Sequence, residues 1–420
     1  MEWKEVRLGD VCDLIAGFAF KAKDFGEFPT KVIKIGDIKP PFVDYVGQVG
    51  VDISNYDINR LSKYTVKYGD YVLAMTGATI GKVGKYISEN FSYINQRVLK
   101  FSPKQNVDAD FINYIICSNI FAKYVVNFVD SESAQPNISA PTISKFAFQI
   151  PSEKDDQRRI ASILSSLDRK IELNYKINAD LEEMAQAIFK NWFVDFEPFK
   201  DGKFLDSELG MIPEGWKVIS LNEILDNVSG YSYKGSELQS SNIAMATIKN
   251  FERKGGFKTE GYKEIVISKK IKETQFVNMF DVLVAHTDLT QNAEIVGNPA
   301  IVLSKGGYEK LIMSMDLTKV ISKIDGVTNG LLYCILSTSR FKEHALGYVN
   351  GTTVLHMSKK AVPEYTCAFP KDINQIRDLC ITLDSIYKRM AVTYDENSRL
   401  SLLRDTLLPR LMSGELEVPE

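Results

Sequence analysis

The chain has 420 residues, of which 45% are hydrophobic and 25% charged, and its formal net charge at pH 7 is −3. This length exceeds what one hydrophobic core supports, so two or more domains are expected in a protein of ordinary soluble composition. No apolar run reaches the roughly 18 residues that span a bilayer, and the N-terminus lacks an apolar signal core. Five scattered cysteines without a CxxC pair suit a reducing compartment, and three separated histidines argue against a metal site. We therefore expect a cytoplasmic protein that binds no metal.

The net charge argues weakly against a free-standing nucleic-acid binder. Residues 1–150 carry 17 basic and 16 acidic side chains, and residues 201–370 carry 19 of each. The excess of acid lies in the two remaining segments. If the neutral segments bind DNA, local basic patches or partner subunits must supply the attraction to phosphate.

The chain contains a diverged tandem repeat. WKEVRLGDV at 3–11 aligns with WKVISLNEI at 216–224, and GFAFKAKDF at 17–25 aligns with GYSYKGSEL at 230–238, both at an offset of 213. Further along, YGDYVLAMT at 68–76 aligns with MFDVLVAHT at 279–287 at an offset of 211. The offset of 213 is kept from residue 3 to residue 38, over some 35 residues, which indicates a duplication.

Each copy has a mixed α/β pattern. In the first copy, residues 32–35, 71–74 and 98–101 are short strand-like runs between glycine and proline turns. A helix is expected over 110–127, and its equivalent over 330–347. The turn-rich stretch LGMIPEG at 209–215 marks the entry to the second copy.

A long helix is expected over 151–196, between the copies. Apolar or amide side chains recur there at alternating steps of four and three residues, which is a heptad seam that requires a partner helix. The seam comprises Ile160, Leu164, Leu167, Ile171, Asn174, Asn178, Leu181, Ala185, Ile188 and Trp192. Ser152 is the expected N-cap, and Pro198 prevents the helix from continuing.

A second heptad seam, from Ile376 to Leu411, follows the second copy. Asp372 and Gln375 resemble a capping box before it, and Gly414 follows it. The polar seam positions Asn174 and Asn178 lie midway along the first helix, and Thr393 and Asn397 lie midway along the second. Antiparallel pairing would place these layers opposite each other, where they fix the register. The alternative is two separate amphipathic helices, each packed on its own domain.

The predicted fold class is α+β, with two homologous mixed α/β domains joined by two long helices that form an intramolecular antiparallel coiled coil. The predicted segments are a first globular domain (1–150), a central helical region (151–200), a second globular domain (201–370) and a distal helical region (371–420).

Motifs for catalysis fail on inspection. TGATIGK at 76–82 has three residues between its glycines and a valine after the lysine, so it does not fit a phosphate-binding P-loop. KPPF at 39–42 begins with lysine, which cannot accept a hydrogen bond from the target amine of an amino-methyltransferase. His286-Thr287-Asp288 lacks an accompanying nucleophile elbow. No nuclease motif is supported, so no catalytic residue is assigned.

Side chains suited to DNA recognition remain. Asn95, Gln96 and Arg97 combine two amides with a guanidinium, groups that read adenine and guanine edges. In the first copy Lys21 and Lys23 interleave with Phe18 and Phe20, and in the second Tyr231 and Lys234 repeat this arrangement. Thr79 and Lys82 lie in a glycine-rich turn, and Thr287, Gln291 and Asn292 occupy the equivalent loop. The alternative is equally open: the aromatic rings are core, the lysines are solvated, and the turn only joins two strands.

Several short sequence motifs resemble those of a known family. QRRIASIL at 157–164, IELN at 171–174 and FKNWFVD at 189–195 resemble the central helical region of type I restriction–modification specificity subunits. LPRLMSGE at 408–415 resembles the distal region, and GMIPEGW at 210–216 resembles the entry to the second target-recognition domain.

The resemblance implies a DNA-binding specificity subunit without catalytic residues, whose two target-recognition domains each read half of a split, asymmetric site in double-stranded DNA. It implies assembly with two modification (methyltransferase) subunits and with restriction (endonuclease and translocase) subunits. The chain itself would bind no cofactor; S-adenosylmethionine, ATP and Mg²⁺ are implied for the partners. The helices would act as spacer and docking surface. The alternatives are a self-contained DNA methyltransferase or nuclease, and a purely structural coiled-coil adaptor.

Overall fold

The computed structural model describes residues 1–129, 136–253, 255–259, 261–416 and 418. It divides into two compact units. Unit 1 comprises Met1–Arg169 and Leu400–Glu420, and unit 2 comprises Lys170–Arg399. Each unit therefore holds one copy of the repeat together with a part of each long helix.

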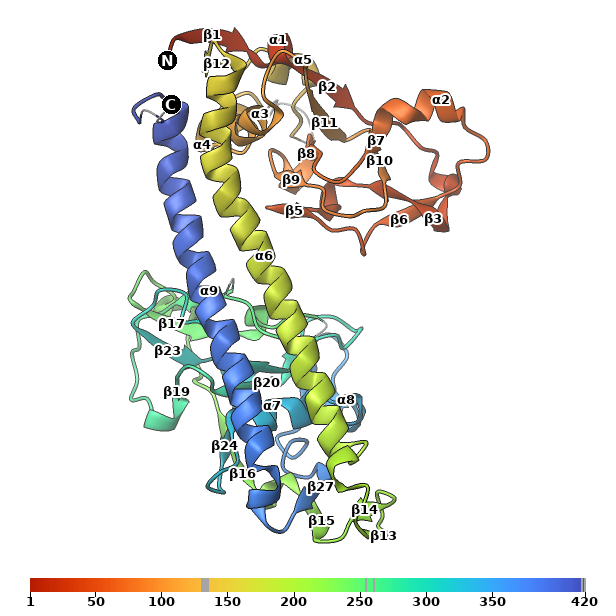
Figure 1. Ribbon diagram of the computed structural model, residues 1–420, viewed down its shortest axis with the longest axis vertical. Helices are drawn as coiled ribbons and strands as arrows, with labels where there is room; N and C mark the ends of the chain where they lie inside the picture. Colours follow the sequence, from red (N-terminus) through yellow and green to blue (C-terminus); the bar gives the residue numbers. More distant parts are fainter. Residues whose placement is uncertain (130–135, 254, 260, 417, 419–420) are drawn as a thin grey trace. The chain divides into compact units, whose positions relative to one another are not determined.

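Unit 1 is built around a two-stranded, a four-stranded and a six-stranded sheet, in the orders β1-β12, β6-β3-β10-β7 and β2-β11-β8-β9-β5-β4 (Figure 1). The strands are β1 (Trp3–Arg7), β2 (Cys12–Ala16), β3 (Phe25–Ile33), β4 (Ile38–Lys39), β5 (Phe42–Val43), β6 (Val49–Val51), β7 (Thr65–Val66), β8 (Tyr71–Ala74), β9 (Val83–Lys85), β10 (Ser92–Ile94), β11 (Val98–Pro103) and β12 (Ala147–Pro151).

Unit 2 repeats this arrangement. Its sheets have the orders β15-β27, β18-β17-β23-β19 and β16-β24-β20-β22, with the additional groups β13-β14 and β21-β26-β25. The strands are β13 (Phe204–Leu205), β14 (Ile212–Pro213), β15 (Trp216–Ser220), β16 (Leu225–Ser229), β17 (Ile243–Ala246), β18 (Lys263–Glu264), β19 (Phe276–Val277), β20 (Val282–Ala285), β21 (Thr287–Asp288), β22 (Pro299–Ile301), β23 (Lys310–Met313), β24 (Leu317–Ser322), β25 (Val349–Asn350), β26 (Leu355–Met357) and β27 (Thr366–Pro370).

The pairing of strands confirms the duplication. The β3/β10 pair of unit 1 is parallel, as is the β17/β23 pair of unit 2, while β10/β7 and β19/β23 are antiparallel. The first strand of each copy also pairs with the last: Trp3 lies opposite Pro151, and Trp216 lies opposite Pro370. Two homologous mixed α/β domains are therefore present, as the repeat predicted.

Short helices flank the sheets. In unit 1 they are α1 (Leu8–Val11), α2 (Ile58–Leu61), α3 (Ala109–Ile116), α4 (Asn119–Asn127) and α5 (Ala140–Ser144), and in unit 2 they are α7 (Asn329–Leu336) and α8 (Ser339–Leu346). The single helices expected over 110–127 and 330–347 are wrong in this respect, because each is two helices. The hydroxyl of Ser118 accepts a hydrogen bond from the Phe121 N–H, and Thr338 does the same for Phe341. These side chains start a new helix by satisfying its free N–H groups.

The two long helices are α6 (Lys154–Phe193) and α9 (Arg377–Met412). Because α6 begins at Lys154, the expected N-cap Ser152 lies outside its first turn. Asp372 caps a short 3₁₀ turn, η10 (Ile373–Ile376), which precedes α9, and accepts from the Asn374 N–H. Gly414 has a positive φ of 74°, the left-handed geometry that commonly follows a helix.

The long helices run antiparallel within each unit (Figure 1). In unit 1 the start of α6 packs with the end of α9 in one cluster, which includes Ile160, Leu164 and Leu411. In unit 2 the end of α6 packs with the start of α9, through Ala185, Phe189 and Leu379 among others. The antiparallel coiled coil predicted from the heptad seams is confirmed.

Each helix also joins the core of a globular domain. Gln157 of α6 is 1% exposed; its Oε1 accepts from the Asp108 N–H at 2.8 Å, and its Nε2 donates to the Pro151 carbonyl at 2.8 Å. This amide ties the first turns of α6 to the start of α3. The two heptad seams, each over thirty residues long, are thus shared between helix–helix and helix–domain packing. The predicted segment boundaries at residues 150, 200 and 370 stay a prediction.

Candidate DNA-recognition surface

Two glycines fix how the candidate segments come together in each domain. A Cβ on Gly17 would lie 2.2 Å from the Asn95 carbonyl oxygen, and one on Gly230 would lie 2.0 Å from that of Ser314. Both positions require glycine, because no side chain fits against the crossing backbone. The crossing sets Phe18 beside Asn95, and Tyr231 beside Ser314, in equivalent bridges.

The first domain exposes most of its candidate residues. Lys21, Lys23, Lys82, Gln96 and Arg97 are exposed, whereas Asn95 and Thr79 are half-buried. The turn of residues 95–97 joins β10 to β11, and the Met75 N–H donates to the Arg97 carbonyl at 2.9 Å. The turn therefore carries its guanidinium and amides on a fixed backbone beside the glycine-rich turn.

The aromatic residues next to the lysines are packed. Phe20 is 8% exposed and belongs to a cluster with Val32, Val51 and Tyr93. Tyr231 is 4% exposed, and its hydroxyl donates to Glu237 Oε1 at 2.6 Å. These rings support the loops from beneath, and we leave Tyr231 out of the surface that could contact DNA.

Buried carboxylates hold the lysine-bearing backbone. The Lys234 N–H donates to Glu237 Oε2 at 2.5 Å, and Ser268 Oγ donates to Glu237 Oε1 at 2.6 Å. These bonds, above all that from Ser268, together with that from Tyr231, lower the pKa of Glu237 to about 2. In the first domain the Tyr56 hydroxyl donates to the Asp24 carboxylate and accepts from the Lys21 N–H.

Sequence reasoning did not select Asp24, Tyr56 or Glu237. One signal was present, because Asp24 and Glu237 align at the same offset of 213 as their flanking residues. An acidic side chain kept three residues after a lysine in both copies indicates a repeated local hydrogen bond. Tyr56 has no such signal, since it lies 32 residues from Asp24.

The corresponding loop of the second domain differs in burial. Thr287 is 6% exposed and pairs with His356 in the β21/β26 ladder, so its side chain does not reach the surface. Lys234, Gln291 and Asn292 are exposed. Gln291 Nε2 donates to the Thr352 carbonyl at 2.5 Å, which links this loop to the loop before β26.

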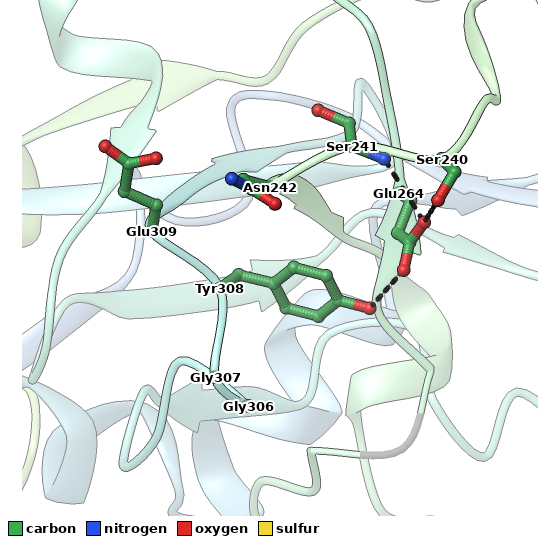
Figure 2. Close-up of a pocket in the computed structure, with 8 residues that line it drawn as sticks. All are labelled: Ser240, Ser241, Asn242, Glu264, Gly306, Gly307, Tyr308 and Glu309. Carbon is green, nitrogen blue, oxygen red and sulfur yellow. Dashed lines mark hydrogen bonds between the residues drawn. The ribbon is translucent and has the colours of Figure 1, made fainter.

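One pocket of the second domain has a different character. It has a volume of about 690 Å³ and is lined by serines, glycines and two glutamates. Figure 2 shows the hydroxyls of Ser240 and Tyr308 directed at the Glu264 carboxylate, at 2.8 and 3.3 Å. The bond from Ser240 is the main reason that the pKa of Glu264 is lowered. An ionised carboxylate disfavours phosphate, so this pocket is not part of the candidate surface.

The polar layers of the coiled coil lie in unit 2. Asn174 Nδ2 donates to Asn397 Oδ1 at 2.8 Å and to Glu396 Oε2 at 2.9 Å, and Lys170 pairs with Glu396 at 3.4 Å. Thr393 Oγ1 instead donates to the Arg389 carbonyl of its own helix. Asn178 is 6% exposed, and neither amide atom has a partner among the described residues.

An ionic contact links the helices in unit 1. Arg404 Nη1 lies 2.9 Å from Asp168 Oδ1, and the Tyr114 hydroxyl of α3 donates to Asp168 Oδ2 at 2.5 Å. One carboxylate thereby connects α6, α9 and the first domain.

Among the described residues, no group of three or more His, Cys, Asp or Glu side chains is placed to hold a metal ion. No helix in this part of the chain combines the length and the apolar character needed to cross a membrane.

The chain is similar to proteins of one known family. The family model of the type I restriction modification DNA specificity domain matches residues 1–183. The HindI specificity subunit of Haemophilus influenzae is 26% identical over 476 aligned positions, which cover 99% of this chain and 100% of that one. The chain is therefore similar over its whole length to type I restriction–modification specificity subunits, and residues 1–183 match their DNA specificity domain. These matches support a DNA-recognition specificity subunit, as the sequence motifs predicted.

Further relatives agree with this assignment. The MjaIX specificity subunit of Methanocaldococcus jannaschii is 26% identical, with 83% of this chain and 78% of that one covered. The crystal structure of the S subunit of a type I restriction–modification system from M. genitalium has the same fold, with a TM-score of 0.55 and 13% identity over 98% of this chain and 96% of that one.

The two recognition domains of this specificity subunit carry different side chains on the same backbone arrangement. The His286 N–H donates to the Asp316 carbonyl at 2.8 Å, which is the equivalent of the Met75 bond to Arg97. Asn95, Gln96 and Arg97 therefore correspond to Ser314, Met315 and Asp316. Like backbones with unlike side chains are what two readers of different base sequences require.

Proposed function

We propose that this chain is the non-catalytic, DNA-reading subunit of a type I restriction–modification complex. In this proposal each recognition domain reads one half of a bipartite, asymmetric site in double-stranded DNA, and partner subunits methylate adenine or cleave. The observation that carries the proposal is that the two domains repeat one backbone arrangement but expose different side chains in the equivalent turns.

The residues that we propose as DNA contacts are the exposed Lys21, Lys23, Lys82, Gln96, Arg97, Lys234, Gln291 and Asn292, together with the half-buried Thr79 and Asn95. Lysines on these loops would contact phosphate and set the position of the domain, while amides and the Arg97 guanidinium would contact base edges. Because each domain is close to neutral, the partners would add to the attraction for the DNA backbone.

The proposed partners are two modification subunits and the restriction subunits of the same system. S-adenosylmethionine, ATP and Mg²⁺ would be bound by these partners and not by this chain, and the complex would act in the cytoplasm. The exposed faces of α6 and α9 carry apolar side chains, such as Leu173, Ile381 and Leu402, which support a docking role for the helices.

Methyl transfer to DNA tests the division of labour. The purified chain, given labelled S-adenosylmethionine and DNA, is expected to transfer no methyl group, whereas the chain mixed with its modification subunits is expected to methylate adenine. A modification subunit with an inactivated methyltransferase site, added to this chain, serves as the control. Transfer by the chain alone would establish a self-contained methyltransferase and overturn the proposal.

The rival role of a structural adaptor is tested by DNA binding. A mixture of the chain and its modification subunits is expected to bind duplex DNA carrying its site more tightly than the modification subunits alone, by a factor that falls as salt is raised. Equal binding with and without this chain would support the adaptor.

A further inference from the structure

The loop from Leu289 to Asn298 in the second recognition domain, called here the pinned loop, is held by a buried carboxylate at its start. Asp288 is 1% exposed. Its Oδ1 accepts from the N–H and the hydroxyl of Thr290, both at 2.9 Å, and its Oδ2 accepts from the N–H groups of Ile295 and Val296 at 2.6 and 3.3 Å. Burial opposes the ionisation of Asp288, but these donors outweigh it and lower the pKa.

A half-buried ammonium group holds the same loop through its carbonyls. Lys342 of α8 donates from Nζ to the carbonyls of Ala293 and Val296 at 3.0 and 2.6 Å, and to Asn298 Oδ1 at 2.7 Å. Burial lowers the pKa of Lys342. The loop backbone is thus bound to a carboxylate through its N–H groups and to an ammonium through its C=O groups, which leaves it little freedom.

Neither the carboxylate nor the ammonium group has an equivalent in the described part of the first recognition domain. Its equivalent loop closes with the Gly81 N–H on the Ala74 carbonyl, and the pinned loop closes with the Gly297 N–H on the Ala285 carbonyl, so the pinned loop is five residues longer. Gly77 aligns with Asp288 at the offset of 211. Ser118 and Thr338 cap equivalent helices, which aligns Ala122 with Lys342. The two charged groups therefore accompany the longer loop.

The tip of the pinned loop carries side chains that remain accessible although Asp288 and Lys342 hold the backbone. Leu289 is 67% exposed, and Gln291 and Asn292 are exposed. The amide nitrogen of Gln291 is engaged by the Thr352 carbonyl, so Gln291 braces the loop. No described residue bonds the side-chain amide of Asn292, which leaves both its donor and its acceptor for a ligand.

We propose that the pinned loop is a base-reading element of the second half-site, in which Asn292 reads an adenine in the major groove and Asp288 and Lys342 are positioning residues. An asparagine amide pairs with N6 and N7 of adenine in a bidentate manner, and the exposed Leu289 is suited to the methyl group of a neighbouring thymine. A loop that is already ordered before binding loses little entropy on the DNA, and the bonds from Asp288 and Lys342 provide this order. The inference rests on the proposed function.

The reading role is tested with Asn292→Ala in the complex with the modification subunits. The substrates are duplexes randomised at the second half-site, and methylated products are sequenced. Discrimination against other bases is expected to fall by roughly 10- to 100-fold at one adenine position, with the remaining positions and the first half-site unchanged. Asn242→Ala, at another exposed asparagine of the same domain, is the matched control. Unchanged discrimination at every position of the second half-site would overturn the reading role.

The positioning role is tested with Lys342→Met, alongside Lys342→Arg and Arg340→Met. Lys342→Met is expected to relax the same adenine position as Asn292→Ala, Lys342→Arg is expected to recover part of the loss, and Arg340→Met, at an exposed cation of the same helix, is expected to change nothing. Equal effects of Lys342→Met on both half-sites would mean a general loss of folding, and the positioning role would be wrong. If Lys342→Met does not fold, Asp288→Asn and Asn292→Ala decide instead.

Failure of this inference is distinct from failure of the proposed function. If exchange of residues 201–370 for the domain of a relative changes the second half-site, but Asn292→Ala does not, only the pinned loop is excluded as the reader. If the exchange also leaves the motif unchanged, the chain does not direct the methylation and the proposed function fails.

Discussion

Asn174 of α6 donates a 2.8 Å hydrogen bond to the amide oxygen of Asn397 on α9, and both side chains are more than nine-tenths buried. The bond defines the antiparallel register of the helix pair within unit 2. Four residues further along α6 and four residues back along α9, the same register places Asn178 opposite Thr393. That second layer is unequal, because the Thr393 hydroxyl bonds its own helix and the Asn178 amide has no described partner.

Removing Asn174 should therefore destabilise the chain. Asn174→Ala is expected to lower the free energy of unfolding by about 1–3 kcal/mol, since it leaves the Asn397 oxygen buried without a donor. Urea denaturation of the purified chain measures the loss. Asn191→Ala, at an exposed position of the same helix, is the control, and an equal effect of the two variants would contradict the assigned role of the amide pair.

Thr393→Asn should stabilise the chain by giving Asn178 a partner. The two side chains have similar volume, and a new buried amide pair is expected to add about 1 kcal/mol to the free energy of unfolding. Thr382 makes the same bond to the carbonyl four residues before it, but at an exposed position of α9. Thr382→Asn should have no comparable effect. A lower stability of Thr393→Asn would show that the layer has no room for a second amide.

The contact between Asp168 and Arg404 should contribute measurable coupling in unit 1. Their side chains are 25% and 27% exposed, and Asp168 also accepts from the Tyr114 hydroxyl. A double-mutant cycle with Asp168→Asn and Arg404→Met is expected to give a coupling energy of about 1 kcal/mol. The cycle for Arg410 and Glu415, which are 45% and 60% exposed, should give less. Equal coupling in the two cycles would mean that partial burial adds nothing here.

Stability should fall in mild acid because of His286. Burial, with repulsion from Lys359, lowers the pKa of His286 to about 4. The unfolded chain takes up this proton near pH 6.5 and the folded chain only near pH 4, so stability present above pH 6.5 is lost as the pH falls through that window.

The first domain supplies the matched replacement, since Met75 aligns with His286 at the offset of 211. Between pH 7.5 and pH 5, His286→Met is expected to lose about 2 kcal/mol less stability than the unchanged chain. Thermal or urea unfolding at several pH values measures the difference. His356→Gln, at an exposed histidine, should leave the pH profile as it was, and an identical profile for His286→Met would contradict the assignment.

The fold could be predicted from the periodicity of the sequence and from its internal repeat. The alternation of three- and four-residue steps from Ile160 to Trp192 is produced by helix pairing itself, so it predicted the coiled coil. The polar positions midway along each seam predicted its antiparallel direction. Local side-chain chemistry was less visible. The breaks after Ile116 and Leu336 depend on single hydroxyls, of Ser118 and Thr338, that resemble any other helix residue in a periodic pattern.

The long-range contacts of the candidate surface could not be predicted from the sequence. Tyr231 stands beside an exposed lysine in the sequence, yet its ring is buried and its hydroxyl is bound to Glu237. Asp288 and Lys342 are 54 residues apart in the sequence, and both bond the backbone of the pinned loop. The turn that carries Arg97 could be located from its side-chain types and the loop that carries Asn292 from the repeat, but the groups that hold them could not.

The most direct test of the account is an exchange of residues 1–150 for the first recognition domain of another specificity subunit, in the complex with the modification subunits. Methylated adenines are then mapped by sequencing the DNA of a host that expresses the complex. One half of the methylated motif is expected to change to that of the donor, while the other half persists. An unchanged motif, or a change in both halves, would contradict two independent readers on one chain.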